Sequence, residues 1–300
     1  MYLRGEKDPM YVFLLGVPKS GSTWLSSVLD QHPDISISNP KEPNIVGSHK
    51  GTFLREYQDP DWDSHSSLFD DKQVKIDASV HTFACPLAPQ RIYDRYPDAR
   101  FILSFREPVA RSVSHWNMVR TTREAKKFGR DWTTFEKAWS DESLHADSYY
   151  GESMKRWLQW FDLDQFILLD SKDMKTNPKE SLGKIEQFLK LPKFEYDISK
   201  NKNANAAASR RPITSFGKTV SIFFSLFPDS IKSPFVSILR KNGFNIYKLP
   251  IMSRKGFTDA PTAEHYLTCG QTLLEDIVLF GEITNFNVEN WLEIFKSKLD

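Results

Sequence analysis

The chain carries, near its start, Gly16-Val17-Pro18-Lys19-Ser20-Gly21-Ser22-Thr23-Trp24-Leu25, the stretch that decides its fold. An apolar run from Tyr11 to Leu15 precedes it and is typical of a buried parallel strand. Leu25, Val28 and Leu29 follow with helical spacing. A strand, a glycine-bounded loop and a helix start predict a phosphate cradle, because loop N–H groups converge on an anion at the positive end of the helix dipole.

The two glycines of this loop have the spacing of a Walker A motif, but its lysine is displaced. That motif places Lys directly after the second glycine, followed by Ser or Thr. Ser22 occupies that position here, and Lys19 stands three residues earlier. The loop can therefore hold a 5′-phosphate, but it has no lysine where the β- and γ-phosphates of ATP would need one.

A second motif begins at the run Phe101 to Phe105, which predicts another buried strand. Arg106 follows it directly, and Pro108 suits the first turn of a helix. Ser114 comes eight residues after Arg106, about two turns into that helix. A guanidinium and a hydroxyl converging in this way predict a phosphate clamp, since arginine can engage phosphate with two hydrogen bonds.

Together the two motifs resemble those of sulfotransferases that use 3′-phosphoadenosine 5′-phosphosulfate (PAPS), in the bacterial and glycosaminoglycan-type branch. The resemblance implies that Lys19 reaches the oxygen between phosphate and the departing sulfuryl group. It implies that Arg106 and Ser114 bind the 3′-phosphate, and that 3′-phosphoadenosine 5′-phosphate (PAP) is the product. The further nucleotide contacts that it implies are Ser20, Gly21, Ser22, Thr23 and Trp24 in the loop, with Trp24 near the adenine, and Arg210 in a late basic loop. Arg254-Lys255-Gly256 is similar to a late element of cytosolic members, but the family's continuation is absent, so we interpret it as coincidence.

Sulfuryl transfer also needs a general base for the acceptor hydroxyl, and three residues are candidates. Glu42 lies in Lys41-Glu42-Pro43, similar to an element of glycosaminoglycan and bacterial members, and Pro43 biases it to an extended conformation. Asp77 stands where the family often has an acid after its second strand. His81 is the third candidate, because phenol- and steroid-modifying members use a histidine. The glycosaminoglycan branch has a lysine where this chain has Ala78, which argues against an acidic polysaccharide acceptor.

Strand and helix signals alternate through the first two-thirds of the chain and predict an α/β, P-loop-containing, three-layer fold. We expect a central parallel sheet flanked by helices, followed by a helical C-terminal region. We expect one domain over residues 1–300, with the nucleotide-binding core in 1–197 and a basic loop and helices in 198–300. Segment 39–72 is expected to be irregular, and 121–147 to be loop with one short helix. Further strands are expected at 74–77 and 166–169, and helices at 88–96, 135–139, 149–161, 178–189, 262–280 and 288–299.

Composition bounds the class of protein without identifying it. Three hundred residues, 40% of them apolar, suffice for one large core, and a formal net charge of +1 gives no field that favours nucleic acid. Two cysteines without a CxxC pattern favour a reducing compartment, and the histidines lack metal-ligand spacing, so no metal is expected. The N-terminus lacks an apolar core of signal-peptide length, so we expect a cytoplasmic enzyme; a lumenal catalytic domain of a truncated Golgi-type protein is the alternative.

The sequence therefore predicts an enzyme that moves the sulfuryl group of PAPS to a hydroxyl acceptor without a metal. The alternatives are a kinase-like phosphotransferase, which would want an acid rather than Arg106 at the strand end to hold Mg²⁺, and a non-catalytic nucleotide-binding protein. The acceptor is left open among a glycan, a lipid or acyl chain, and a small molecule. Segment 220–239 is interpreted as two short helices on the core or as an amphipathic lid that touches a membrane surface.

Overall fold

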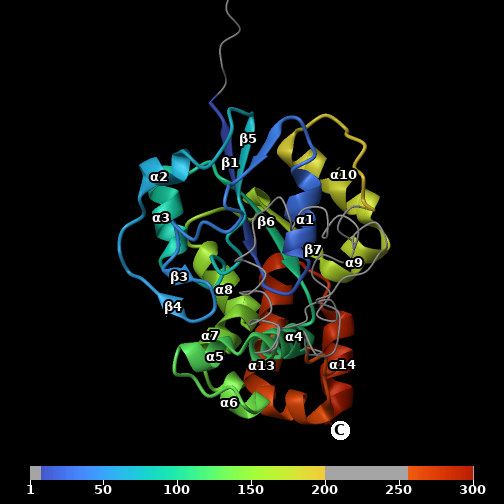
Figure 1. Cartoon of the computed structure of the whole chain (residues 1–300). Helices are drawn as coiled ribbons and strands as arrows, with labels where there is room; N and C mark the ends of the chain where they lie inside the picture. Colours follow the sequence, from blue (N-terminus) through green and yellow to red (C-terminus); the bar gives the residue numbers. More distant parts are fainter. Residues whose placement is uncertain (1–7, 200–255, 300) are drawn as a thin grey trace, which may run out of the picture.

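A five-stranded parallel sheet forms the centre of the protein. The computed structural model describes residues 8–199 and 256–299, and Figure 1 shows the arrangement. The sheet has the order β2-β5-β1-β6-β7, and every neighbouring pair is parallel. The predicted α/β fold class is confirmed. The strands are β1 (Met10–Gly16), β2 (Ile35–Ile37), β5 (Val74–Asp77), β6 (Arg100–Phe105) and β7 (Phe166–Asp170).

Helices cover both faces of this sheet because its central strands are apolar on both sides. Phe13 and Leu15 of β1 enter one core, whereas Val12 and Leu14 enter the other. The second core is closed by α1 (Ser22–Leu29), α9 (Ser171–Thr176) and α10 (Pro178–Leu189). The first core is closed by α3 (Ala88–Arg95), α4 (Pro108–Thr122), α8 (Tyr150–Trp157), α13 (Ala263–Thr284) and α14 (Glu289–Leu299).

The helices α4, α13 and α14 gather at the end of the sheet where the strands finish (Figure 1). α13 packs against α8 and α14. The carboxylate of Asp276 in α13 accepts hydrogen bonds from the N–H groups of Gly151 (2.9 Å) and Glu152 (2.8 Å) at the start of α8. The C-terminal helices are thus fastened to the same core as the sheet.

The structure corrects several expected boundaries. Segment 39–72 is not wholly irregular: it holds an antiparallel hairpin, β3 (His49–Lys50) with β4 (Leu54–Arg55), and α2 (Trp62–Ser66). Strand β2 was not expected, because three residues are too few for a periodic signal. Segment 121–147 contains α5 (Glu124–Lys127) and α7 (Glu142–His145) besides the expected α6 (Phe135–Trp139), with a 3₁₀ turn at Ala146–Ser148. Helix α8 ends earlier than expected, before a second 3₁₀ turn at Leu163–Gln165. Among the described helices, none has the length and apolar character needed to cross a membrane.

Candidate active site

The loop between β1 and α1 is fixed by contacts with its neighbours. Gly16 has a φ of +138°, and a Cβ there would collide with the carbonyl oxygen of Val80, so only glycine fits. The N–H of Val17 donates to the carbonyl oxygen of Ser104 (3.0 Å), and the hydroxyl of Ser104 donates to the carbonyl oxygen of Ser20. Strand β6 therefore holds both ends of the loop.

The N-terminus of α1 has the features of an anion-binding site. Gly21, with a φ of +95°, is its N-cap and supplies no side-chain hydrogen bond, and the first turn has no acidic residue. The first N–H to bond backward along the helix is that of Leu25, to the carbonyl of Gly21 (3.0 Å), so the N–H groups before it are left for a ligand. The Ser20 hydroxyl is buried and has no hydrogen-bond partner in the described part of the chain. The residues present therefore fit a bound phosphate.

Lys19 reaches from the loop to α4. Its Nζ lies 3.6 Å from the Sδ of Met118. Ala110, Ser114 and Met118 are half-buried, while most residues between them are buried, so they form one accessible stripe along α4 at i, i+4 and i+8. The structure thus brings the predicted Lys19 and Ser114 to the same face of α4.

Arg106 lies at the head of this stripe, directly after β6. The hydroxyl of Tyr150 donates to its carbonyl oxygen (2.9 Å) and fixes the backbone there. The adjacent Glu107 carboxylate is used by α4 itself, where it accepts from the N–H groups of Val109 (3.0 Å) and Ala110 (2.6 Å). Within residues 8–199 and 256–299 the Arg106 guanidinium makes no ion pair or hydrogen bond, which leaves it available for a phosphate.

Lys175 is a cation that the sequence analysis missed. The register pairs Phe105 with Asp170, so Arg106 and the start of α9 leave the sheet side by side. Met174 places its methyl group 3.2 Å from where a Cβ on Gly21 would lie, so α9 packs against the phosphate loop. Burial and, next, the charge of Arg106 lower the pKa of Lys175. No motif marks this residue; only the β6–β7 pairing brings it near Arg106.

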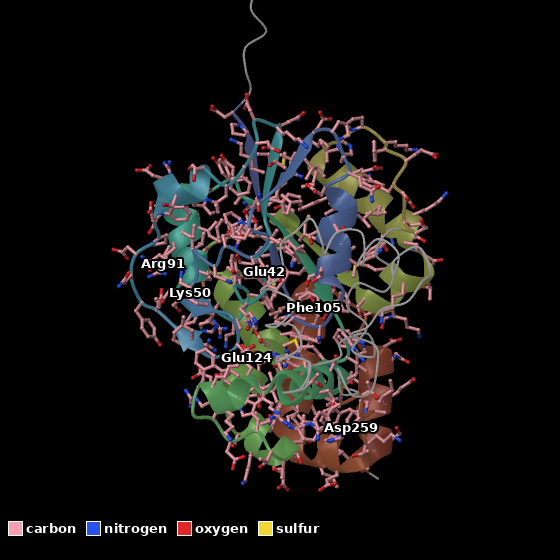
Figure 2. All side chains as sticks on the ribbon, in the orientation of Figure 1. Glu42, Lys50, Arg91, Phe105, Glu124 and Asp259 are labelled. Atoms are coloured by element: carbon pink, nitrogen blue, oxygen red, sulfur yellow. The ribbon has the colours of Figure 1, made fainter. Side chains whose placement is uncertain are left out.

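Of the three candidate bases, Glu42 is the accessible carboxylate. Its side chain is 38% exposed, and its Oε1 accepts from the Nζ of Lys41 at 2.7 Å. Figure 2 labels it together with Lys50 of β3. Asp77 is only 2% exposed, and its oxygens already accept from the N–H (2.9 Å) and hydroxyl (2.6 Å) of Ser79. These contacts favour a structural or positioning role for Asp77 over proton abstraction.

His81 belongs to a buried charged cluster that sequence reasoning did not find. Its Nδ1 lies 3.1 Å from Oδ2 of Asp147, and the fully buried Arg111 lies 3.7 Å from the same oxygen. Arg111 also donates to the hydroxyl of Ser148 (2.7 Å) and the carbonyl of Leu144 (2.8 Å). Burial opposes ionisation of Asp147, but His81, Arg111 and His115 together hold its pKa well below the usual range. The contacts of this cluster join residues 32 to 66 positions apart, so only the tertiary structure assembles it.

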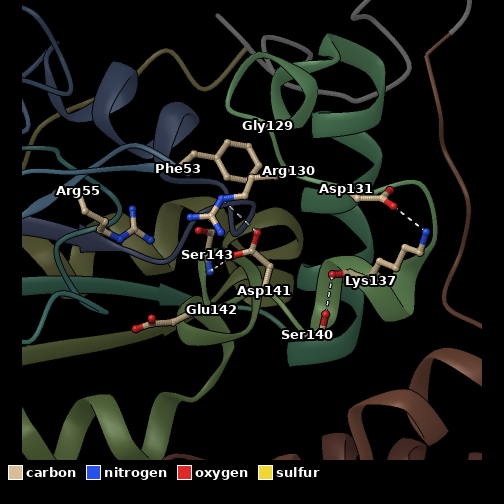
Figure 3. Close-up of a pocket in the computed structure, with 10 residues that line it drawn as sticks. All are labelled: Phe53, Arg55, Gly129, Arg130, Asp131, Lys137, Ser140, Asp141, Glu142 and Ser143. Carbon is tan, nitrogen blue, oxygen red and sulfur yellow. Dashed lines mark hydrogen bonds and ion pairs between the residues drawn. The ribbon is translucent and has the colours of Figure 1, made fainter.

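A cavity of about 480 Å³ lies elsewhere (Figure 3). None of the predicted site residues lines it. Its charges compensate each other, since Lys137 pairs with Asp131 (2.6 Å) and Arg130 lies 3.9 Å from Asp141. Its walls are Phe53, Arg55, Gly129, Arg130, Asp131, Lys137, Ser140, Asp141, Glu142 and Ser143.

Some expectations concern residues outside the described ranges. They are the nucleotide contact of Arg210, the interpretation of segment 220–239, and the interpretation of Arg254 and Lys255. Trp24 is half-buried against the core that α1 closes, and its contact with adenine stays a prediction.

Comparison with known proteins agrees with this geometry. The family model of the sulfotransferase domain matches residues 9–215. Heparan sulfate glucosamine 3-O-sulfotransferase 5 of Mus musculus is 25% identical over 189 residues, covering 60% of this chain and 53% of that protein. The bifunctional heparan sulfate N-deacetylase/N-sulfotransferase 1 of Caenorhabditis elegans is 24% identical over 198 residues, covering 62% and 22%. The chain thus spans about half the length of the first of these curated relatives, or less.

A solved structure supports the fold over nearly the whole length. The sulfotransferase from Alicyclobacillus acidocaldarius superimposes with a TM-score of 0.61 and 18% identity, covering 95% of this chain and 99% of that one. At this identity the likeness establishes the fold. The family match covers residues 9–215, which include the loop between β1 and α1.

Proposed function

Since this chain belongs to the sulfotransferase family, we propose that it transfers the sulfuryl group of PAPS to a hydroxyl acceptor and releases PAP. One observation carries the proposal. The N-terminus of α1 has no side-chain cap, and within the described residues neither the Ser20 hydroxyl beside it nor the Arg106 guanidinium has a hydrogen-bond or ion-pair partner. These groups flank the stripe of α4 that Lys19 reaches. Two phosphate sites with an ammonium beside them suit a nucleotide that carries a phosphate at each end. The family match also favours sulfuryl transfer over the kinase-like alternative.

In this mechanism the protein acts by position and charge. Sulfuryl transfer resembles phosphoryl transfer, in which a loose, in-line transition state spreads charge onto the equatorial oxygens and the leaving group. The N–H groups at the start of α1 and the Ser20 hydroxyl would hold the 5′-phosphate, and Arg106 with Ser114 would hold the 3′-phosphate. Lys19 would stabilise the charge that develops on the bridging oxygen as the S–O bond breaks.

We propose Glu42 as the base that takes the proton of the acceptor hydroxyl. Its carboxylate is accessible, whereas those of Asp77 and Asp147 are buried and engaged in hydrogen bonds. Nδ1 of His81 is already hydrogen-bonded to Asp147. A comparison of the variants His81→Gln and Glu42→Gln tests His81 as the alternative base.

We propose a carbohydrate hydroxyl as the acceptor, because the curated relatives include sulfotransferases of heparan sulfate. Ala78, in place of the lysine of the glycosaminoglycan branch, argues for a glycan of low negative charge. We also propose that residues 1–300 form one domain, since α13 and α14 complete the core of the sheet.

Sulfur-labelled PAPS tests the proposal directly. The purified chain is incubated with labelled PAPS and heparan sulfate, chitotetraose, decanol or 4-nitrophenol, in buffer with EDTA. Transfer of label to at least one acceptor is expected, with chitotetraose the best. In parallel, calorimetry is expected to show PAP binding at least tenfold more tightly than ATP. Metal-dependent ATP turnover, or ATP binding as tightly as PAP, would refute the proposal.

A further inference from the structure

A buried chain of hydrogen bonds begins at Asp77, at the end of β5. Its Oδ2 lies 3.2 Å from Nε2 of His65, and its Oδ1 accepts from both the N–H (2.9 Å) and the hydroxyl (2.6 Å) of Ser79. All three side chains are buried. Hydrogen bonds to a carboxylate are about twice as strong as neutral ones, so Asp77 fixes the direction of the Ser79 hydroxyl.

The same hydroxyl holds the loop that carries Glu42. Ser79 Oγ accepts from the backbone N–H of Asn44 at 3.0 Å. A serine hydroxyl has a single proton, and the contact with Asp77 takes it, so the lone pairs of the oxygen face Asn44. Asn44 in turn donates from its Nδ2 to the carbonyl oxygen of Glu42 (3.0 Å).

The other side of this loop is fixed as well. Lys50 donates from its Nζ to the carbonyl oxygens of Asn44 and Ile45, the latter at 3.2 Å. The hydroxyl of Ser38 donates to the carbonyl of Lys41 at 2.9 Å. Asn44 has a φ of +53°, in the left-handed region that asparagine tolerates. The backbone on both sides of Glu42 is thus bonded to buried groups, while its side chain stays accessible.

The loop is also tied to the phosphate site. Val80, the residue after Ser79, contacts Gly16 at the start of the phosphate loop through its carbonyl oxygen. Phe83 donates its N–H to the carbonyl of Leu15 (3.2 Å). One short segment, 79–83, therefore contacts the loop of Glu42 on one side and the phosphate loop on the other.

We propose that Asp77 and Ser79 are positioning residues, which hold Glu42 in register with the phosphate loop through the backbone of Asn44. The inference rests on the proposed role of Glu42 as base. A reacting group displaced by about 1 Å can lose up to about 100-fold in rate. Removing the Ser79 hydroxyl frees the Asn44 N–H and lets the loop shift, without touching the nucleotide.

A double-mutant cycle of Ser79→Ala and Glu42→Gln tests this. The readout is release of labelled sulfate from PAPS with water as the acceptor, together with transfer to chitotetraose. Ser79→Ala is expected to lower kcat about 10- to 100-fold, with the Kd for PAP unchanged. In the Glu42→Gln background the same substitution is expected to change kcat less than twofold, because its effect passes through Glu42.

Ser36→Ala is the matched control. Ser36 is also 2–4% exposed, like Ser79, and its Oγ accepts from the backbone N–H of Asp70 (2.8 Å), in a loop that does not carry Glu42. It removes a buried hydroxyl that accepts from a backbone N–H, as Ser79→Ala does, but none that donates to a carboxylate. It is therefore expected to lower thermal stability no more than Ser79→Ala and to leave kcat within twofold of the wild type. Equal losses for the two serine variants would overturn the inference, since both would then reflect general destabilisation.

The remaining outcomes separate this inference from the proposed function. An equal loss from Ser79→Ala in both backgrounds overturns the coupling to Glu42, and so does no loss at all. A Glu42→Gln variant with wild-type kcat overturns both the base and its positioning, while PAP binding and transfer of label by the wild type would still support a sulfotransferase. Asp77→Asn gives a second route to the same cycle if Ser79→Ala fails to fold.

Discussion

Replacing Arg106 with alanine tests its proposed contact with the 3′-phosphate. The guanidinium has no ion pair or hydrogen bond within the described residues, and the bond from Tyr150 reaches the Arg106 backbone, which the substitution keeps. The variant therefore leaves no buried group without a partner, and its folding stability is expected to change by less than about 0.5 kcal/mol.

The size of the effect follows from the contact that is lost. A hydrogen bond between charged groups contributes about 1.5–3 kcal/mol, which corresponds to a 10- to 150-fold weaker Kd. The loss is expected for PAP and not for adenosine 5′-phosphate, which lacks the 3′-phosphate.

Titration calorimetry of both nucleotides, at fixed ionic strength and without metal, measures the difference. Arg106→Lys serves as the control, since it keeps the charge and loses the two-pronged geometry, and an intermediate Kd for PAP is expected. An unchanged Kd for PAP would refute the clamp. An equal loss for both nucleotides would show that Arg106 acts on the fold of the site rather than on the 3′-phosphate.

Three further predictions concern other cations and the buried cluster. Lys19→Ala is expected to lower kcat by about two to four decades through loss of charge stabilisation on the leaving oxygen, and a loss under about threefold in single-turnover assays would contradict that role. Lys175→Gln is expected to weaken PAP binding about three- to tenfold in calorimetry, with Lys172→Gln on the same helix as the neutral control, and equal affinities would refute the contact. Asp147→Asn leaves the Arg111 charge buried and uncompensated, so urea denaturation is expected to show about 3–5 kcal/mol lower stability, and a loss under about 1 kcal/mol would contradict the pairing. Because the folded-state pKa of Asp147 lies below its unfolded value of about 4, the stability it contributes is present above that pH and is lost as the pH falls, a dependence that the variant should lack.

Strands β1, β5, β6 and β7 could be predicted from the sequence, and the two phosphate motifs recognised in it, because their signals are local. β1 and β6 alternate between two cores, so their runs are apolar throughout, and the loop after β1 requires Gly16 where Val80 approaches. The displaced lysine and the Arg106–Ser114 spacing lie within single strand–loop–helix units. Such signals can be recognised without any knowledge of the rest of the chain.

The amino-acid sequence by itself thus determined the α/β fold class, and it predicts the phosphate loop and the Arg106–Ser114 clamp, since each motif depends on residues a few positions apart. Only the tertiary structure decided which residues lie next to the site residues in space. Through the β6–β7 register it brought α9 with Lys175 near Arg106, it buried Asp147 between His81 and Arg111, and it hydrogen-bonded Ser79 to the loop of Glu42. These neighbours lie about 35 to 70 positions apart in the sequence, and such long-range proximity depends on the packing of the whole chain, which no local pattern encodes.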